Sequence, residues 1–152
     1  MCTKMPNIVL VTGGFDPVHS GHISYLKEAR SLGYRLIVGL NSDEWLIRKK
    51  GKFFLPFEER AAVLGAIQYV SDVISFNDDD GTSNDAIDKV LGHNASYLLF
   101  ANGGDRSLEN TPEYLKYGDH PWMKWEFNVG GSKTNSSSKI LADWQNNCVQ
   151  TK

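Results

Sequence analysis

The sequence of 152 residues is poor in cysteine, with Cys2 and Cys148 near its opposite ends. This scarcity excludes a disulfide-rich scaffold and is typical of a reducing compartment, so we expect a cytoplasmic protein. A long apolar run and a signal peptide are both lacking, and we therefore expect no contact with a membrane. The formal net charge of −2 likewise gives no reason to expect nucleic acid as a partner.

The composition that remains is that of an ordinary globular protein. Hydrophobic residues make up 41% of the chain and charged residues 22%, which disfavours disorder and fibrous structure. The length suits one hydrophobic core, and no internal repeat is visible. We therefore expect a single domain over residues 1–152.

Apolar, β-branched segments alternate along the chain with segments of helical periodicity. The expected strands cover residues 7–12, 35–40, 73–76, 97–101 and 122–129, and the expected helices cover 20–30, 57–69, 84–91 and 138–148. This alternation predicts an α/β protein with a Rossmann-like, doubly wound and mainly parallel five-stranded sheet that has helices on both faces. Such sheets bind ligands beyond the carboxyl ends of their strands.

The loop after the first strand contains the richest chemistry. Gly13 and Gly14 permit a tight turn and the close approach of a ligand to the backbone. His19 and His22 share a face at the expected start of a helix, where unpaired N–H groups and the helix dipole favour phosphate. Two imidazoles there supply donors for charge that develops on a phosphate oxygen, and Gly21 leaves room for a triphosphate.

Three alternatives for this loop are weaker. A zinc site needs further ligands, and His93 and His120 are isolated in the sequence. A dinucleotide-binding loop needs the spacing G-x-G-x-x-G, which is not present. Histidines that only cap the helix are the third alternative, but their place after a strand and a glycine pair favours a ligand site.

The segment Gly14–His22 (GFDPVHSGH) resembles the HxGH signature of the cytidylyltransferase-like nucleotidyltransferases. Four further segments resemble motifs of that family in the same order, namely Val38–Asp43, Pro56–Arg60, Asn102–Asp105 and Ser136–Ile140. The resemblance covers about residues 7–144. Within the family, the chain is most similar to the nucleotidyltransferase domain of ADP-heptose synthesis enzymes and next to glycerol-3-phosphate cytidylyltransferase.

The resemblance implies a set of site residues. The catalytic groups are expected to be His19, His22, Lys52 and Lys133, with Lys50 as the next candidate for the family's catalytic lysine. Lys133 stands near the place where cytidylyltransferases usually carry an Arg-Thr pair. The expected nucleotide-binding residues are Gly13, Gly14, Phe15, Asp16, Gly21, Asn41, Asp43, Arg60, Gly104, Asp105, Ser136 and Ser137.

Several of these positions also have simpler interpretations. The basic residues of segment 48–52 form either a solvated loop or mobile cations for a triphosphate. Arg60 either anchors a phosphate or pairs with Glu58 or Glu59. The acidic segment 78–81 fails the EF-hand pattern and is interpreted as a solvated loop. The tryptophans are interpreted as core or dimer-contact residues.

The expected reaction joins a nucleoside monophosphate from an NTP, with ATP favoured over CTP, to a sugar-phosphate or polyol-phosphate acceptor and releases pyrophosphate. The expected cofactor is Mg²⁺, bridging phosphate oxygens, and no metal site made by the protein is predicted. We also expect a homodimer. The alternatives are a cytidylyltransferase of the glycerol-3-phosphate type and a non-catalytic nucleotide-binding module.

Overall fold

The computed structural model describes residues 5–92, 97–104, 106–131 and 135–150, with the side chains of the last helix described through residue 147. Its strands are β1 (Ile8–Gly13), β2 (Arg35–Leu40), β3 (Asp72–Ser75), β4 (Leu98–Gly103) and β5 (Met123–Val129). Its helices are α1 (Ser20–Ser31), α2 (Asp43–Lys50), α3 (Phe57–Gly65), α4 (Asn84–Gly92), α5 (Pro112–Tyr117) and α6 (Ser137–Gln150), and a 3₁₀ turn covers Leu108–Asn110.

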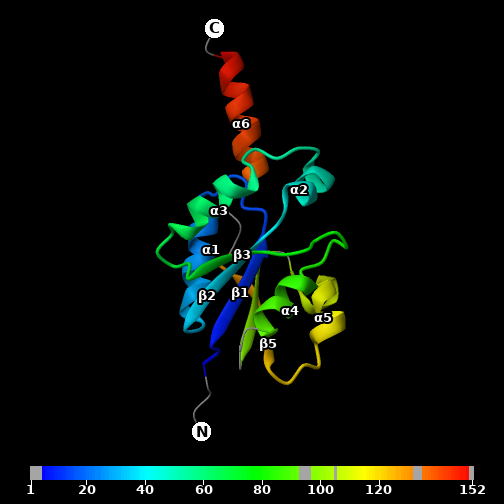
Figure 1. Ribbon diagram of the computed structural model, residues 1–152. Helices are drawn as coiled ribbons and strands as arrows, with labels where there is room; N and C mark the ends of the chain where they lie inside the picture. Colours follow the sequence, from blue (N-terminus) through cyan, green and yellow to red (C-terminus); the bar gives the residue numbers. More distant parts are fainter. Residues whose placement is uncertain (1–4, 93–96, 105, 132–134, 151–152) are drawn as a thin grey trace.

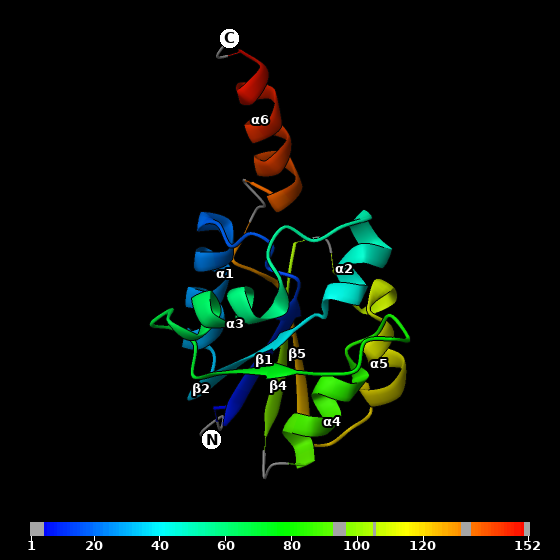
Figure 2. The ribbon, with the colours of Figure 1, turned by 45° about the horizontal axis from the view of Figure 1, so that its top comes forward.

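The strands form one sheet in the order β3-β2-β1-β4-β5, and every neighbouring pair is parallel. Helices α1 and α3 lie on one side of the sheet, and α4 and α5 lie on the other (Figures 1 and 2). The predicted fold class is therefore confirmed, including the helices on both faces. Because the chain runs outward from β1 in both directions, the switch point of the sheet lies between β1 and β4.

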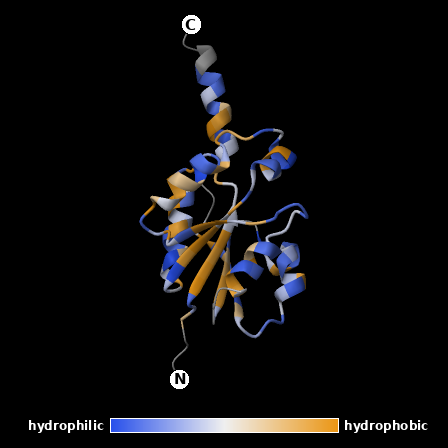
Figure 3. Cartoon of the chain, in the orientation of Figure 1, coloured by the Kyte–Doolittle hydropathy of each residue, from blue (hydrophilic) through white to orange (hydrophobic). Residues whose placement is uncertain are grey.

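Side chains alternate along β1 and divide the core into two clusters. Val9 and Val11 pack with Leu26 and Leu64 under α1 and α3, whereas Ile8 and Leu10 pack with other apolar residues under α4 and α5. Figure 3 shows this apolar character concentrated in the strands. Both faces of the parallel sheet are thus covered, and its polar residues gather at the carboxyl edge.

Helix α2 differs from the sequence-based expectation, because its basic residues lie in a helix and not in a loop. Ser42 caps its start, since the hydroxyl accepts a hydrogen bond from the Trp45 amide at 3.0 Å. Gly51 ends it with a left-handed φ of 85°. Arg48 and the two lysines after it occupy the last turn, where positive charge is favourable at the negative end of the helix dipole. Of the basic residues in segment 48–52, only Lys52 lies in the loop after α2.

Two other elements also differ from expectation. Helix α3 ends at Gly65 and not at residue 69, and the short helix α5 was not predicted. Helix α6 was predicted, and it extends away from the body of the domain (Figures 1 and 2). Trp144 on this helix is 59% exposed. In the described part of the chain, each helix falls short of the length and apolarity that a bilayer span requires.

Candidate active site

The two histidines of the β1–α1 loop form a capping box at the start of α1. His19 is the N-cap residue, and its Nδ1 accepts a hydrogen bond from the Gly21 amide at 3.0 Å. The Nδ1 of His22 in turn accepts from the His19 amide at 3.2 Å. The two rings stack with their centroids 3.9 Å apart. The sequence-based alternative of capping histidines is therefore correct as a description of the local structure.

Capping also prepares both rings for chemistry. Because each Nδ1 accepts from a backbone amide, a neutral ring carries its proton on Nε2, which is then a hydrogen-bond donor. The start of a 12-residue helix adds its positive dipole end to these donors. Gly21 is required for this geometry, since a Cβ there would lie 2.8 Å from Cε1 of His19. The arrangement suits a phosphate oxygen on which charge increases.

The residues before the histidines fix the loop. Phe15 is buried and has a left-handed φ of 49°, an unfavourable conformation for a bulky residue. Its ring lies 4.8 Å from the ring of His22. Asp16 is 4% exposed, and its carboxylate accepts from the amides of Phe54 at 2.6 Å and Leu55 at 2.7 Å. Asp16 therefore ties the histidine loop to the loop that precedes α3.

That second loop carries the expected catalytic lysine. Lys52 lies between the end of α2 and the amides that Asp16 holds, and its residue is exposed. A long cationic side chain on a tethered loop is able to swing toward a triphosphate at the α1 N-terminus. Lys50, the alternative, ends α2 and is also exposed.

Arg60 is fully buried, and its guanidinium joins four segments of this edge. Nε donates to the Leu55 carbonyl at 2.8 Å, and one terminal nitrogen donates to the carbonyls of Gly14 and Asn41 at 2.9 and 2.8 Å. The other terminal nitrogen forms an ion pair with Asp43 at 2.6 Å. The loops after β1 and β2, the start of α2 and the segment before α3 are thus held by one side chain.

These contacts replace the pairing of Arg60 with Glu58 or Glu59 that the sequence suggested. Both glutamates are exposed, and the partner of Arg60 is Asp43. A guanidinium whose nitrogens already donate to carbonyls and a carboxylate is poorly placed to anchor a phosphate. The structure therefore favours a positioning role for Arg60.

Asn41 contacts Asp78, a buried residue that the sequence had suggested would lie in a solvated loop. Its Nδ2 donates to the carboxylate of Asp78 at 3.0 Å, and Ser42 donates to the same carboxylate through its amide and hydroxyl at 2.8 and 2.7 Å. Asp78 is 2% exposed, so the expectation of a solvated loop is wrong for this residue. Its place just after β3, at the carboxyl edge of the sheet, was the available signal.

The end of β4 and the start of α6 lie on the α1 side of the sheet. The Tyr25 hydroxyl donates to the Ala101 carbonyl at 2.8 Å, and burial raises the pKa of Tyr25. The Ser137 hydroxyl donates to the Pro17 carbonyl at 2.8 Å, which joins α6 to the histidine loop. Gly104 turns the chain after β4 with a φ of 61°. The expected site residues Asp105 and Lys133 lie outside the described residues, as does His93.

The Ser136 hydroxyl has a structural role in the same region. It accepts a hydrogen bond from the Lys139 amide at 3.1 Å and so caps the start of α6. Ser136 and Ser137 together place a second helix N-terminus beside the loop that carries the two histidines. Two helix N-termini at one edge increase the attraction for a chain of phosphates.

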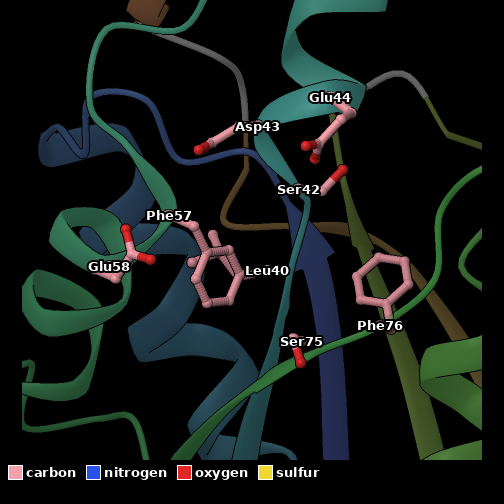
Figure 4. A pocket seen from close by; sticks show the side chains of 8 residues that line it. All are labelled: Leu40, Ser42, Asp43, Glu44, Phe57, Glu58, Ser75 and Phe76. Carbon is pink, nitrogen blue, oxygen red and sulfur yellow. The ribbon is translucent and has the colours of Figure 1, made fainter.

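A pocket opens at the carboxyl ends of β2 and β3 (Figure 4). Its apolar side chains form one part of the wall, and three carboxylates stand around it. The lining residues are Leu40, Ser42, Asp43, Glu44, Phe57, Glu58, Ser75 and Phe76. Because carboxylates repel phosphates, this pocket is unsuited to a triphosphate.

The carboxylates nearest the histidine loop already have partners. Asp16 accepts two backbone amides, and Asp43 pairs with Arg60. Among the residues that the structure describes, no group of three or more histidine, cysteine or acidic side chains could hold a metal ion. In proteins, Mg²⁺ commonly keeps several waters and binds through substrate phosphates together with one or two carboxylates.

Comparison with known proteins agrees with this architecture. The cytidylyltransferase-like family model matches residues 10–128. The bifunctional protein HldE of Enterobacter sp. (strain 638) is 38% identical over 146 residues, which are 91% of this chain and 28% of that protein. HldE of Klebsiella pneumoniae (strain 342) is 38% identical over 144 residues, with 90% and 28% covered. The chain thus spans about 28% of the length of these curated relatives.

A solved structure supports the same relationship. The lipopolysaccharide core biosynthesis protein from Thermoplasma volcanium is 26% identical to this chain, and the two structures superpose with a TM-score of 0.63. The match covers 86% of this chain and 99% of that protein.

Proposed function

The chain belongs to the cytidylyltransferase-like family and is a nucleotidyltransferase, and from this premise we propose that it transfers AMP from ATP to a phosphorylated sugar or polyol. Pyrophosphate is the second product. The observation that supports this most strongly is the histidine capping box, in which both Nδ1 atoms accept backbone amides at the N-terminus of α1 and a neutral ring carries its proton on Nε2. No other described part of the chain combines a helix start with two imidazoles.

In the proposed reaction, an oxygen of the acceptor's phosphate attacks the α-phosphorus of ATP. The new bond joins that oxygen to the α-phosphorus, and the bond from the α-phosphorus to the bridging β-oxygen breaks. The electron pair leaves with pyrophosphate. The attacking phosphate oxygen is already anionic, so neither a general base nor a covalent enzyme intermediate is needed.

The protein's part is to position the reactants and stabilise charge. His19 and His22 donate to the α-phosphate as its charge increases and to the departing pyrophosphate. Lys52 and Lys133 are proposed to neutralise the phosphates from two sides. Asp16 and Arg60 act on these groups indirectly, because they hold the loops that carry them.

Two features support ATP as the nucleotide. The segments Asn41–Asp43 and Asn102–Asp105 resemble the ADP-heptose synthesis enzymes, which use ATP. The enzymes that use CTP typically carry an Arg-Thr pair near the position of Lys133, and this chain has no arginine there. The same resemblance supports a sugar phosphate as the acceptor.

Pyrophosphate release with each of ATP and CTP, measured against a panel of sugar 1-phosphates and glycerol 3-phosphate, tests the proposal. We expect release that depends on both substrates, and binding of ATP at least about tenfold tighter than binding of CTP, or roughly 1.4 kcal/mol. Tighter binding of CTP would make the nucleotide assignment wrong and leave the transferase intact. Failure of both nucleotides to bind would indicate that the reaction itself is wrong.

A further inference from the structure

A group of buried polar side chains lies across the sheet from the nucleotide side, at the same carboxyl edge. Asn102, the penultimate residue of β4, is 8% exposed, and its Nδ2 has no hydrogen-bond partner. Glu113, near the start of α5, is 3% exposed, and its Oε2 has no partner either. The Oδ1 of Asn84, at the start of α4, is buried in the same unpaired state.

The alternation of the strands places these groups on one face. Ile8 and Leu10 of β1 and Leu98 and Phe100 of β4 belong to the cluster under α4 and α5, and β1 and β4 pair in register there. Two residues farther along, Thr12 and Asn102 point to the same face. The Thr12 hydroxyl confirms this, since it accepts from the Ser83 hydroxyl at 2.9 Å just before α4.

Ser83 also connects Glu113 to this edge. A hydrogen bond from the Ser83 backbone amide is among the causes that lower the pKa of Glu113, although burial raises it more. Ser83 therefore contacts the end of β1 on one side and α5 on the other. Helices α4 and α5 lie side by side in both views (Figures 1 and 2), so Asn84, Asn102 and Glu113 all belong to the side of the sheet that these helices cover.

A buried polar atom without a partner is energetically costly, so a ligand group that pairs with these atoms would bind favourably there. Among the described residues, the buried unpaired atoms are two donors, Nδ2 of Asn102 and Nε1 of Trp125 on β5, and two acceptors, from Asn84 and Glu113. Hydroxyl groups both donate and accept, and they match such a mixed set. An anion does not, because Glu113 and the carboxylates that line the adjoining pocket with Asn84 repel it.

The proposed nucleotide residues and the unpaired groups lie on different faces of the sheet. The Tyr25 hydroxyl of α1 donates to the Ala101 carbonyl near the end of β4, and Ser137 at the start of α6 donates to the Pro17 carbonyl, so the proposed nucleotide residues lie over the α1 face. The unpaired groups lie over the α4 and α5 face. A ligand whose phosphate is held at the start of α1 can extend across the β1–β4 crevice to reach them.

We propose that Asn84, Asn102 and Glu113 bind hydroxyl groups of the acceptor substrate, and that they restrict the enzyme to polyhydroxylated phosphates. The proposal rests on the transferase function proposed above. The three side chains bind the uncharged end of the acceptor, while its phosphate end lies at His19 and His22. The matching substrate class is a sugar phosphate or polyol phosphate whose hydroxyls lie several bonds from the reacting oxygen.

The test compares acceptors and isosteric variants of the full chain at saturating nucleotide. The acceptors are a heptose 1-phosphate, a hexose 1-phosphate, glycerol 3-phosphate and propyl phosphate, which has no hydroxyl groups. The variants are Glu113→Gln and Asn102→Asp, with Glu109→Gln as a control on an exposed carboxylate nearby. Circular dichroism and the melting temperature show whether each variant is folded.

For the unmodified protein, we expect kcat/KM for the best hydroxylated acceptor to exceed that for propyl phosphate by at least about 10²-fold. In Glu113→Gln and Asn102→Asp, KM for that acceptor rises at least about tenfold, while KM for the nucleotide changes less than about twofold. Glu109→Gln behaves like the unmodified protein. The acceptor comparison in the unmodified protein requires no variant, so it decides the matter even if a substitution prevents folding.

Other results would overturn the proposal. Equal use of propyl phosphate, or a rise in nucleotide KM in place of acceptor KM, would show that these groups do not bind acceptor hydroxyls. Binding of nucleotide without turnover of any hydroxylated acceptor would also contradict it. Failure to bind any nucleotide would instead contradict the proposed function, which separates the two failures.

Discussion

The histidines of the β1–α1 loop cap α1 through one ring nitrogen each, and the other nitrogen is proposed to act in the reaction. Each Nδ1 accepts a backbone amide and completes the start of α1, and this leaves Nε2 as the donor of a neutral ring. A substitution to alanine therefore removes a helix cap together with a proposed catalytic donor. Variants that keep the cap are needed to separate the two effects.

We expect His19→Asn and His22→Gln to keep the fold and still lower kcat by about 10² or more, because each removes a transition-state donor. Asparagine is a favourable N-cap, and glutamine at the third helical position completes a capping box. Steady-state kinetics measures the effect, with nucleotide affinity expected to change much less. His120→Ala is the matched control, since His120 lies outside the loop. An equal loss in that control would remove the support for the assignment.

Glu113 gives a pH-dependent prediction that is independent of activity. Burial raises the pKa of this carboxyl above its ordinary value of 4.5, and Arg106 opposes the shift. The folded protein therefore binds more protons than the unfolded chain above that value, so stability falls as pH rises toward the folded-state pKa. Glu113→Gln removes this loss. Urea unfolding should show the variant gaining stability relative to the unmodified protein from pH 4 to neutral pH; a constant difference would contradict the assignment.

Contacts between residues that are close in the sequence were predictable, whereas contacts between residues far apart in the sequence were not. The place of the histidine pair at a helix start was predictable because a strand, two glycines and a helix start follow one another within residues 7–22. Arg60 bonds to Gly14, which is 46 positions away, and Asp78 bonds to Asn41, 37 positions away. No local pattern contains such contacts, and the sequence therefore suggested the nearby Glu58 and Glu59 as partners of Arg60.

At the scale of elements, the five strands and the long helices were predicted because their apolar periodicity is strong. Helix α2 was missed because its charged residues outweigh one buried leucine, Leu46. Its stability depends on the Ser42 cap, on Asp78 behind that cap and on tertiary contacts. Helix α5 has six residues, too few to show a period.

Arg60 connects these elements, and its removal should be costly. We expect Arg60→Leu to lower the free energy of unfolding by about 3–5 kcal/mol, since it leaves Asp43 unpaired and three buried carbonyls without donors. Urea denaturation monitored by circular dichroism measures the change. Arg35→Leu, at an exposed position of β2, should cost less than about 0.5 kcal/mol. Similar losses of stability in both variants would show that Arg60 does not hold these segments together.

At the scale of the whole molecule, the sheet separates two binding regions. Nucleotide residues are proposed over α1 and the start of α6, and acceptor residues over α4 and α5. The separation follows from the switch point between β1 and β4, which the strand order of the sheet shows. The buried groups of the second region were not predicted, because their burial depends on how α4 and α5 pack.

Helix α6 supports the expectation of a homodimer. It leaves the body of the domain (Figure 1), and Trp144 on it is 59% exposed, while aromatic residues are enriched at interfaces. We propose that α6 packs against a second copy. Sedimentation at micromolar concentration should show a dimer, and Trp144→Glu should shift it to a monomer. Leu115→Glu, which changes a 91% exposed residue on α5, should remain dimeric. A monomeric unmodified protein would contradict the proposal.

The central claim is that an acceptor phosphate attacks the α-phosphorus of ATP at the N-terminus of α1. Phosphorus NMR of a reaction of the full chain with magnesium-ATP and a heptose 1-phosphate tests it most directly. The account predicts two coupled resonances of a new diphosphate diester together with pyrophosphate, and their loss in His19→Asn. Formation of ADP and a phosphorylated acceptor, or of inorganic phosphate alone, would place the attack at another phosphorus and contradict the account.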